Sequence, residues 1–190
     1  MLRKLARAIA GVTLTVSALA TLPALAQKVK LATSMGDIVI ELDAARAPRS
    51  AANFVQYAKD GHFNGTIFHR VIDNFMIQGG GMLPDMTQKP TRTPIPLESK
   101  NGLRNTRGTV AMARTGDPNS ATSQFFINLK DNAFLNANES PDPNGYAVFG
   151  KVVLGMDVVD KIRTVPTGSK GPHENVPLDP VIIKQATLEP

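Results

Sequence analysis

The sequence predicts one mostly β domain, in which about eight short antiparallel strands form a closed barrel capped by two α-helices. Three observations lead to this prediction. Short runs of alternating or continuous apolar residues recur along the chain, as is typical of strands. Gly, Pro, Asn and Asp, which favour turns, separate these runs. Only two segments have apolar residues at helical spacing, and many strands with few helices favour a sheet that closes on itself.

The first two strands are predicted as a β-hairpin. Residues 28–33 and 37–42 alternate apolar and polar side chains, and Ser34-Met35-Gly36 between them has the composition of a turn. Further short runs with β-type composition follow the first helix. They lie at residues 66–72, 75–78, 110–113, 124–129, 147–153 and 181–188.

The two helices are predicted on either side of most of these strands. Pro48 suits the first turn of a helix, and apolar residues then recur at helical spacing until Gly61, which is a suitable C-terminal stop. A second and shorter helix is predicted over residues 156–162. Residues 84–96 contain four prolines and no periodicity, so they are predicted to form an ordered surface loop.

The N-terminus has the layout of a secretory signal peptide. Three basic residues lie within the first seven positions, an uncharged stretch runs from Ala8 to Leu22, and Ala24-Leu25-Ala26 offers a small-x-small cleavage site. We therefore expect residues 1–26 to be a cleavable signal and residues 27–190 to be the mature domain. An uncleaved membrane anchor is the alternative, since the uncharged stretch is about long enough to span a bilayer.

Removal of these 26 of the 190 residues leaves 164, a length that suits one compact domain. Lys and Arg together fall from 21 to 18 against 16 acidic residues, so the net charge falls from +5 to +2. Most of the basicity belongs to the signal, and no nucleic-acid partner is expected. The chain has no Cys, which excludes thiol chemistry.

Two segments concentrate the candidate functional residues. One runs from Phe68-His69-Arg70 to Gln78-Gly79-Gly80, and the other from Ala111-Met112-Ala113-Arg114 to Ser123-Gln124-Phe125-Phe126-Ile127. Together they resemble the two signature blocks of the cyclophilins. The resemblance continues through Asn132-Ala133-Phe134-Leu135 and residues 145–152, and it covers essentially the whole mature chain.

This resemblance implies a peptidyl-prolyl cis/trans isomerase built on an eight-stranded barrel with two capping helices. Arg70 corresponds to the catalytic arginine, and Gln78 to the glutamine that positions the arginine and the substrate. Ala113 and Arg114 lie where the family binds the backbone of an extended peptide. The full set of implied substrate-binding residues is Phe75, Met76, Ala113, Arg114, Gln124, Phe126, Phe134, Leu135 and Tyr146.

Three residues depart from the eukaryotic pattern of the family. Phe134 replaces a tryptophan, Tyr146 a histidine, and Arg114 an asparagine that is frequent there. The tryptophan contributes an indole N–H contact to cyclosporin, so we expect weak binding of that inhibitor and intact isomerase chemistry. The resemblance is nearest to exported bacterial members, which implies a periplasmic enzyme that acts on proline-containing polypeptides. Rotation about a bond needs no cofactor, and a monomer is expected because the sequence has no heptad pattern and no large apolar stripe beyond the predicted core.

Other kinds of site have little support in the sequence. The three histidines, His62, His69 and His173, have no metal-site spacing, and His69 is expected to be buried rather than to act as a base. Asp142-Pro143-Asn144-Gly145 resembles the start of a calcium loop, but the twelfth position is Val153 instead of Glu. A non-catalytic, proline-binding chaperone module remains the alternative function.

Overall fold

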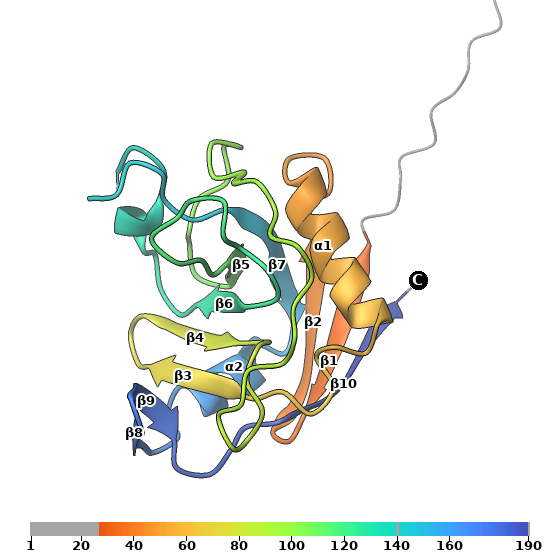
Figure 1. Ribbon diagram of the computed structural model, residues 1–190, viewed down its shortest axis with the longest axis vertical. Helices are drawn as coiled ribbons and strands as arrows, with labels where there is room; N and C mark the ends of the chain where they lie inside the picture. Colours follow the sequence, from red (N-terminus) through yellow and green to blue (C-terminus); the bar gives the residue numbers. More distant parts are fainter. Residues whose placement is uncertain (1–26, 140, 190) are drawn as a thin grey trace, which may run out of the picture.

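The structure, a computed structural model, describes residues 27–139 and 141–189. Eight strands form one curled antiparallel sheet in the order β10-β1-β2-β7-β5-β6-β4-β3 (Figure 1), so the predicted mostly β class is confirmed. The strands are β1 (Lys28–Thr33), β2 (Gly36–Leu42), β3 (Phe68–Ile72), β4 (Met76–Gly79), β5 (Thr109–Met112), β6 (Phe125–Asn128), β7 (Val148–Leu154) and β10 (Ile183–Glu189).

The two edge strands of this sheet meet at one end. Ile67, just before β3, forms an antiparallel bridge with Ile182, just before β10. The N–H of Phe68 donates to the carbonyl of Val181 at 2.9 Å, next to that bridge. The contact is short, and it is the arrangement that a sheet closing into a barrel requires.

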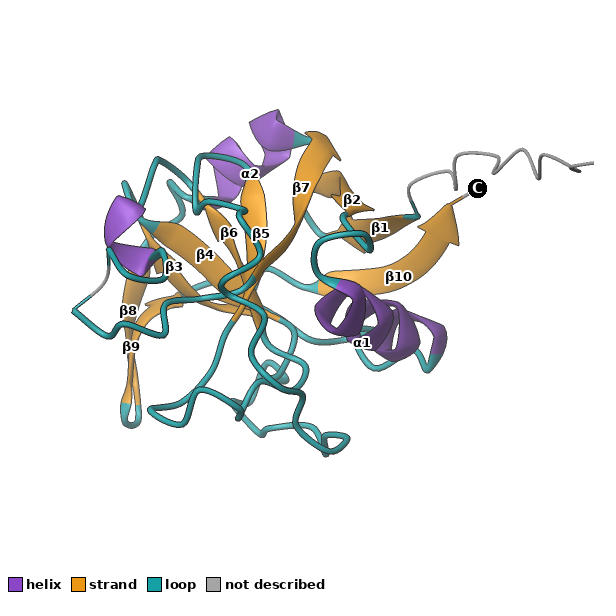
Figure 2. Ribbon diagram, turned by 90° about the horizontal axis from the view of Figure 1, so that it is seen from above, coloured by secondary structure: helices purple, strands orange, loops and turns teal. Residues whose placement is uncertain are grey.

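Two helices pack against the inner face of the sheet from different sides (Figure 2). In α1 (Pro48–Lys59), the ring of Phe54 lies 4.9 Å from that of Phe63 and 5.2 Å from that of Phe125. In α2 (Met156–Ile162), Val158, Val159 and Ile162 are buried in the same core. Both helices lie where the spacing of apolar residues predicts them.

The first turn of α1 is capped by a residue from a distant loop. Ala47, the N-cap residue, has no side chain that can accept a hydrogen bond. The carboxylate of Glu98 takes this role, because it accepts from the N–H groups of Arg49 and Ser50 at 3.0 and 2.8 Å. The preceding loop, residues 84–96, is also fixed to α1, since the N–H of Arg92 donates to the hydroxyl of Tyr57 at 2.8 Å.

A β-hairpin and a 3₁₀-helix were not predicted from the sequence. Strands β8 (Thr167–Lys170) and β9 (His173–Pro177) form a separate hairpin that lies against β3. Most residues of β8 are exposed, so the strand lacks the apolar alternation that reveals other strands. A 3₁₀-helix, η1 (Ala133–Leu135), was also missed. None of the helices in the described part of the chain is long and apolar enough to cross a membrane.

Candidate active site

The register of the strands places the candidate residues in one row across the outer face of the sheet. Arg70 on β3 is opposite Gln78 on β4, Gln78 is opposite Phe126 on β6, and Phe126 is opposite Ala111 on β5. Directly opposite residues in an antiparallel pair point to the same face. Side chains from segments far apart in the sequence therefore become neighbours.

The polar part of this row is a chain of side-chain hydrogen bonds. The amide nitrogen of Gln78 donates to Oε1 of Gln124 at 2.9 Å, so Oε1 of Gln78 faces the guanidinium of Arg70. Nη1 of Arg70 lies 3.5 Å from that oxygen, at the limit of a hydrogen bond. Gly81 makes room for this arrangement, because a Cβ there would lie 2.5 Å from Cγ of Gln124. The guanidinium thus has an oriented neighbour and keeps most of its donors available.

A pocket of about 110 Å³, lined by both polar and apolar side chains, lies beside the guanidinium. An apolar cavity of roughly 150 Å³ holds benzene, so this volume suits a smaller ring. Met76, Phe126 and Leu135 are buried and belong to one cluster of side chains. The residues that line the pocket are Arg70, Phe75, Met76, Gln78, Ala113, Arg114, Phe126, Leu135 and Tyr146.

The two remaining candidate residues lie at the border of the pocket. Gln124 contacts Gln78, as described above. Phe134 in η1 stacks on Phe75, with 5.6 Å between the ring centroids and an interplanar angle of 28°. Despite this stacking, Phe134 remains 47% exposed to solvent. All eleven residues selected from the sequence therefore lie in or beside one pocket.

Three buried asparagines that sequence reasoning missed support the walls of this pocket. Nδ2 of Asn132 donates to the carbonyl of Phe75 at 2.9 Å, and Nδ2 of Asn105 donates to that of Leu135 at 3.2 Å. Asn128 lies between them and bonds to both side chains. Its position within the apolar run of β6 was the available signal, because a buried amide requires hydrogen-bond partners.

Larger grooves occur elsewhere on the molecule. The groove beside β2 and β7 has a volume of about 730 Å³ and is lined by Leu42, Leu103 and Lys151 among others. Its ionic groups are partly paired with each other, as in the contact of 3.2 Å between Lys151 and Glu41. The smaller pocket is the stronger candidate because the guanidinium of Arg70 lies beside the buried apolar side chains of Phe126 and Leu135.

Comparison with known proteins agrees with this geometry. The family model described as cyclophilin type peptidyl-prolyl cis-trans isomerase/CLD matches residues 28–188. The chain belongs to the cyclophilin family. Members of this family are enzymes that isomerise peptidyl-prolyl bonds and need no cofactor, so this cyclophilin is a peptidyl-prolyl cis-trans isomerase.

Its relatives include enzymes from distant bacteria. Peptidyl-prolyl cis-trans isomerase cyp18 of Streptomyces antibioticus is 59% identical over 161 residues, which are 84% of this chain and 97% of the relative. Peptidyl-prolyl cis-trans isomerase B of Escherichia coli is 57% identical over 157 residues, 82% of this chain and 96% of that protein.

Solved cyclophilin structures share the fold. A cyclophilin type isomerase of Cryptosporidium parvum superimposes with a TM-score of 0.74 at 30% identity, covering 87% of this chain and 98% of that one. The same protein has been crystallised in the presence of the dipeptide Ala-Pro, with the same TM-score and identity over 86% of this chain and 99% of that one.

The segment that resembles a calcium loop has another role in this cyclophilin. The carboxylate of Asp142 accepts from the N–H of Asn144 at 3.0 Å and pairs with the guanidinium of Arg114. Within residues 27–139 and 141–189, no group of three or more His, Asp or Glu side chains is arranged to hold a metal ion.

His69, the neighbour of Arg70, is buried below the sheet surface and is 6% exposed. Its Nδ1 has no hydrogen-bond partner in the described part of the chain. Burial lowers the pKa of His69 from 6.5 to about 4, and the nearby charges of His173 and Arg70 act in the same direction. The imidazole is therefore neutral at physiological pH, as expected for a buried residue that is not a base.

The depressed pKa predicts that acidification destabilises the fold. Between pH 6.5 and 4 the unfolded chain binds a proton at His69 that the folded chain does not, so the free energy of unfolding falls as the pH falls. The loss attributable to this residue is about 3 kcal/mol at pH 4. Urea denaturation of the wild type and of His69→Gln from pH 8 to 4 measures this loss as the difference between the two proteins. The contribution of His62 is the same in both and cancels in that difference. Parallel pH profiles for the two proteins would contradict the assignment.

Proposed function

We propose that the pocket described above is the isomerase site, with Arg70 as its catalytic residue and Gln78 as its partner. The observation that supports this most is the position of the Arg70 guanidinium, which lies beside a pocket of about 110 Å³ with a buried apolar wall and next to the side chain of Gln78. The pocket takes the proline ring of an extended polypeptide. The guanidinium then lies near the peptide bond that precedes the ring.

The reaction requires a twisted peptide bond and no bond making or breaking. An X-Pro bond resists rotation by about 18–20 kcal/mol, because the resonance of the amide must be lost. In the twisted state the proline nitrogen becomes pyramidal and regains a basic lone pair. A hydrogen bond from Arg70 to that nitrogen is much stronger in the twisted state than in the planar ground state, and such a difference accelerates the reaction.

Magnitudes are consistent with this role. A reduction of the barrier by about 5 kcal/mol gives an acceleration of a few thousand-fold. Charge-assisted hydrogen bonds are roughly twice as strong as neutral ones, and they gain further strength where water is excluded. Met76, Phe126 and Leu135 are buried and apolar, so a peptide bond held against them is shielded from water on that side. Arginine also stays protonated at every relevant pH, so no titrating group is needed.

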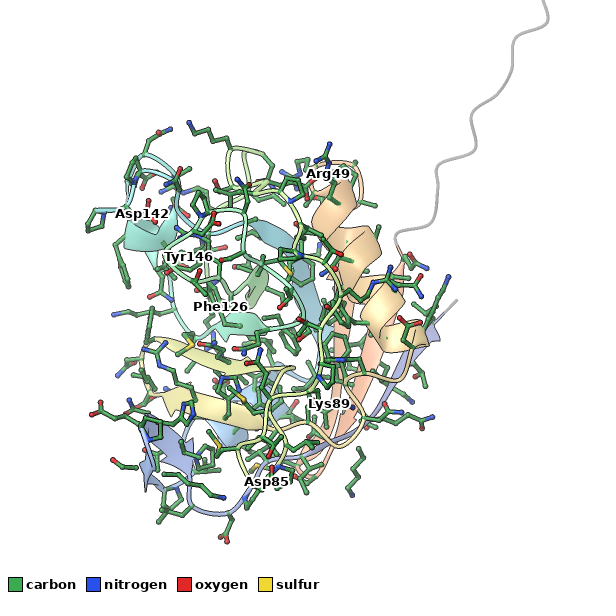
Figure 3. All side chains as sticks on the ribbon, in the orientation of Figure 1. Arg49, Asp85, Lys89, Phe126, Asp142 and Tyr146 are labelled. Atoms are coloured by element: carbon green, nitrogen blue, oxygen red, sulfur yellow. The ribbon has the colours of Figure 1, made fainter. Side chains whose placement is uncertain are left out.

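Replacement of the guanidinium tests the catalytic role. We expect Arg70→Ala to slow the catalysed cis/trans exchange of a short X-Pro peptide at least a hundred-fold, which corresponds to about 2.7 kcal/mol of transition-state stabilisation. NMR exchange spectroscopy measures the rate. Arg49→Ala is the matched control, because Arg49 is exposed on α1 at a distance from Phe126 and Tyr146 (Figure 3).

The same experiment distinguishes the isomerase from a proline-binding chaperone. A chaperone needs the apolar cup but has no use for a cation that acts only on a twisted bond. Peptide binding without acceleration by the wild type would favour the chaperone. Equal rates for the wild type and a folded Arg70→Ala variant would remove Arg70 from the mechanism.

We further propose that this cyclophilin is exported to the periplasm, where as a monomer it assists the folding of other exported chains. The basic start, the uncharged stretch and Ala24-Leu25-Ala26 support export. The family match begins at residue 28, the second residue of the proposed mature chain. Residues 1–26 lie outside the described part of the chain, so this proposal rests on the sequence.

Export predicts a defined N-terminus. We expect the protein recovered from the periplasmic fraction of an expressing bacterium to begin at Gln27, as read from its intact mass. Ala26→Asp is expected to block processing, because signal peptidase requires a small residue at that position. Protein that retains residues 1–26 in the cytosolic fraction would contradict export. Protein that retains them in the membrane fraction would instead indicate an uncleaved anchor.

Cyclosporin is proposed to bind weakly to this cyclophilin. The support is Phe134, whose ring stacks on Phe75 at the border of the pocket but offers no N–H donor. We expect Phe134→Trp to tighten cyclosporin binding at least tenfold, about 1.4 kcal/mol, while isomerase activity changes less than threefold. Calorimetric titration measures the affinity. Equal affinities for the two proteins would show that another departure limits binding.

A further inference from the structure

The guanidinium of Arg114 is engaged within the protein, although the residue lines the pocket. Its side chain is only 2% exposed. Nε and Nη2 donate to the carbonyl of Gly145 at 3.1 and 2.9 Å, Nη1 donates to that of Thr115 at 2.9 Å, and Nη2 also pairs with the carboxylate of Asp142. An arginine has five N–H donors, so few are left for a substrate.

These bonds hold the segment that ends in Tyr146. Asp142 and Gly145 both lie in the turn that precedes the tyrosine. Gly145 has a positive φ of 58°, and a Cβ there would lie 2.4 Å from the backbone nitrogen of Ala137, so the turn packs closely on the chain after η1. Arg114 therefore fixes a compact turn from the side of the pocket.

Arg114 also contacts the aromatic ring that the turn positions. Its guanidinium carbon lies 4.6 Å from the centroid of Tyr146. On another side, the same ring makes an edge contact with Phe126, with 5.6 Å between centroids and an angle of 79°. Figure 3 shows Phe126, Tyr146 and Asp142 gathered in one part of the molecule. The ring of Tyr146 is thus held by the guanidinium of Arg114 and by the ring of Phe126.

We propose that Arg114 is a positioning residue that fixes the turn 142–145 and the ring of Tyr146, and thereby determines which residues beside proline the enzyme accepts. The inference rests on the proposed isomerase site. Asp142 contributes to this positioning, because its carboxylate holds the guanidinium of Arg114 over the ring of Tyr146. Arg114 acts through Tyr146, and its own side chain does not bind the substrate.

The second ion pair between an arginine and this region provides a matched control. Arg104 binds Glu139 through two hydrogen bonds of 2.6 and 2.8 Å, and both side chains are about half exposed. Glu139 lies three residues before Asp142 and is not among the residues that line the pocket. Glu139→Gln therefore weakens an ion pair in the same segment without changing the support of Tyr146.

The test measures kcat and KM for a series of peptides Ala-X-Pro-Phe in which X is Ala, Leu, Glu, Lys or Phe. We expect Arg114→Gln to raise KM about tenfold for the preferred peptide, to change kcat less than threefold and to alter the ranking of X. Asp142→Asn is expected to alter the ranking in the same direction by a smaller amount, and the double variant to add little. Glu139→Gln is expected to keep the wild-type ranking within twofold.

The NMR signals of the Tyr146 ring report its position independently of activity. They are expected to shift in Arg114→Gln and Asp142→Asn and to stay unchanged in Glu139→Gln. Unchanged ranking and unchanged ring signals in a folded Arg114→Gln protein would overturn the inference, and so would an equal effect of Glu139→Gln. If Arg114→Gln does not fold, the inference is tested with Asp142→Asn, again by the ranking of X and by the NMR signals of the Tyr146 ring. An inactive wild type would instead contradict the proposed function itself.

Discussion

The register of the antiparallel strands β3, β4, β6 and β5 determines which side chains form the central row of the site. Each strand contributes alternate side chains to two faces, so a slip of one residue would exchange the faces. In the observed register, Phe125 and Ile127 on β6 belong to the inner core, while Phe126 between them faces the pocket. The core and the active site are therefore specified by the same hydrogen-bonded ladder.

On the outer face of this part of the sheet, the apolar wall of the pocket is built like a second small core. Met76, Phe126 and Leu135 pack together as residues in a protein interior do, and the backbone behind them is held by buried asparagines. The amide nitrogens of Asn132 and Asn105 are paired with backbone carbonyls of the pocket walls, which makes these walls more rigid, although Oδ1 of Asn132 has no partner in the described part of the chain. The rigidity matters because the proposed mechanism depends on a guanidinium that is already in place before the peptide twists.

Much of the fold could be predicted from the sequence because its signals are local. The alternation in residues 28–33 and the helical spacing in residues 156–162 identify elements whose observed bounds are Lys28–Thr33 and Met156–Ile162. The hairpin β8–β9 could not be found in this way, since its residues are mostly exposed and its place depends on contact with β3. The short bridge between Ile67 and Ile182 likewise depends on how far the whole sheet curls.

The composition of the site could be predicted from motifs, but the function of individual side chains within it could not. The sequence places Arg114 at a substrate-binding position, and only the structure shows that its guanidinium is bonded to Gly145, Thr115 and Asp142. The support given by Asn132 to Phe75 spans 57 positions in the chain. Contacts of this kind arise from tertiary packing, which no local pattern encodes.

We propose that Arg70 stabilises the twisted peptide and not the bound planar substrate. The most direct test of this proposal is to measure, on the same samples of wild type and Arg70→Ala, both the Kd of an X-Pro peptide and the cis/trans exchange rate within the saturated complex. We expect Kd values within about threefold of each other and an exchange rate that falls at least a hundred-fold, because the lost interaction exists only in the transition state. A Kd weakened a hundred-fold with an unchanged exchange rate in the complex would contradict this proposal and would make Arg70 a binding residue.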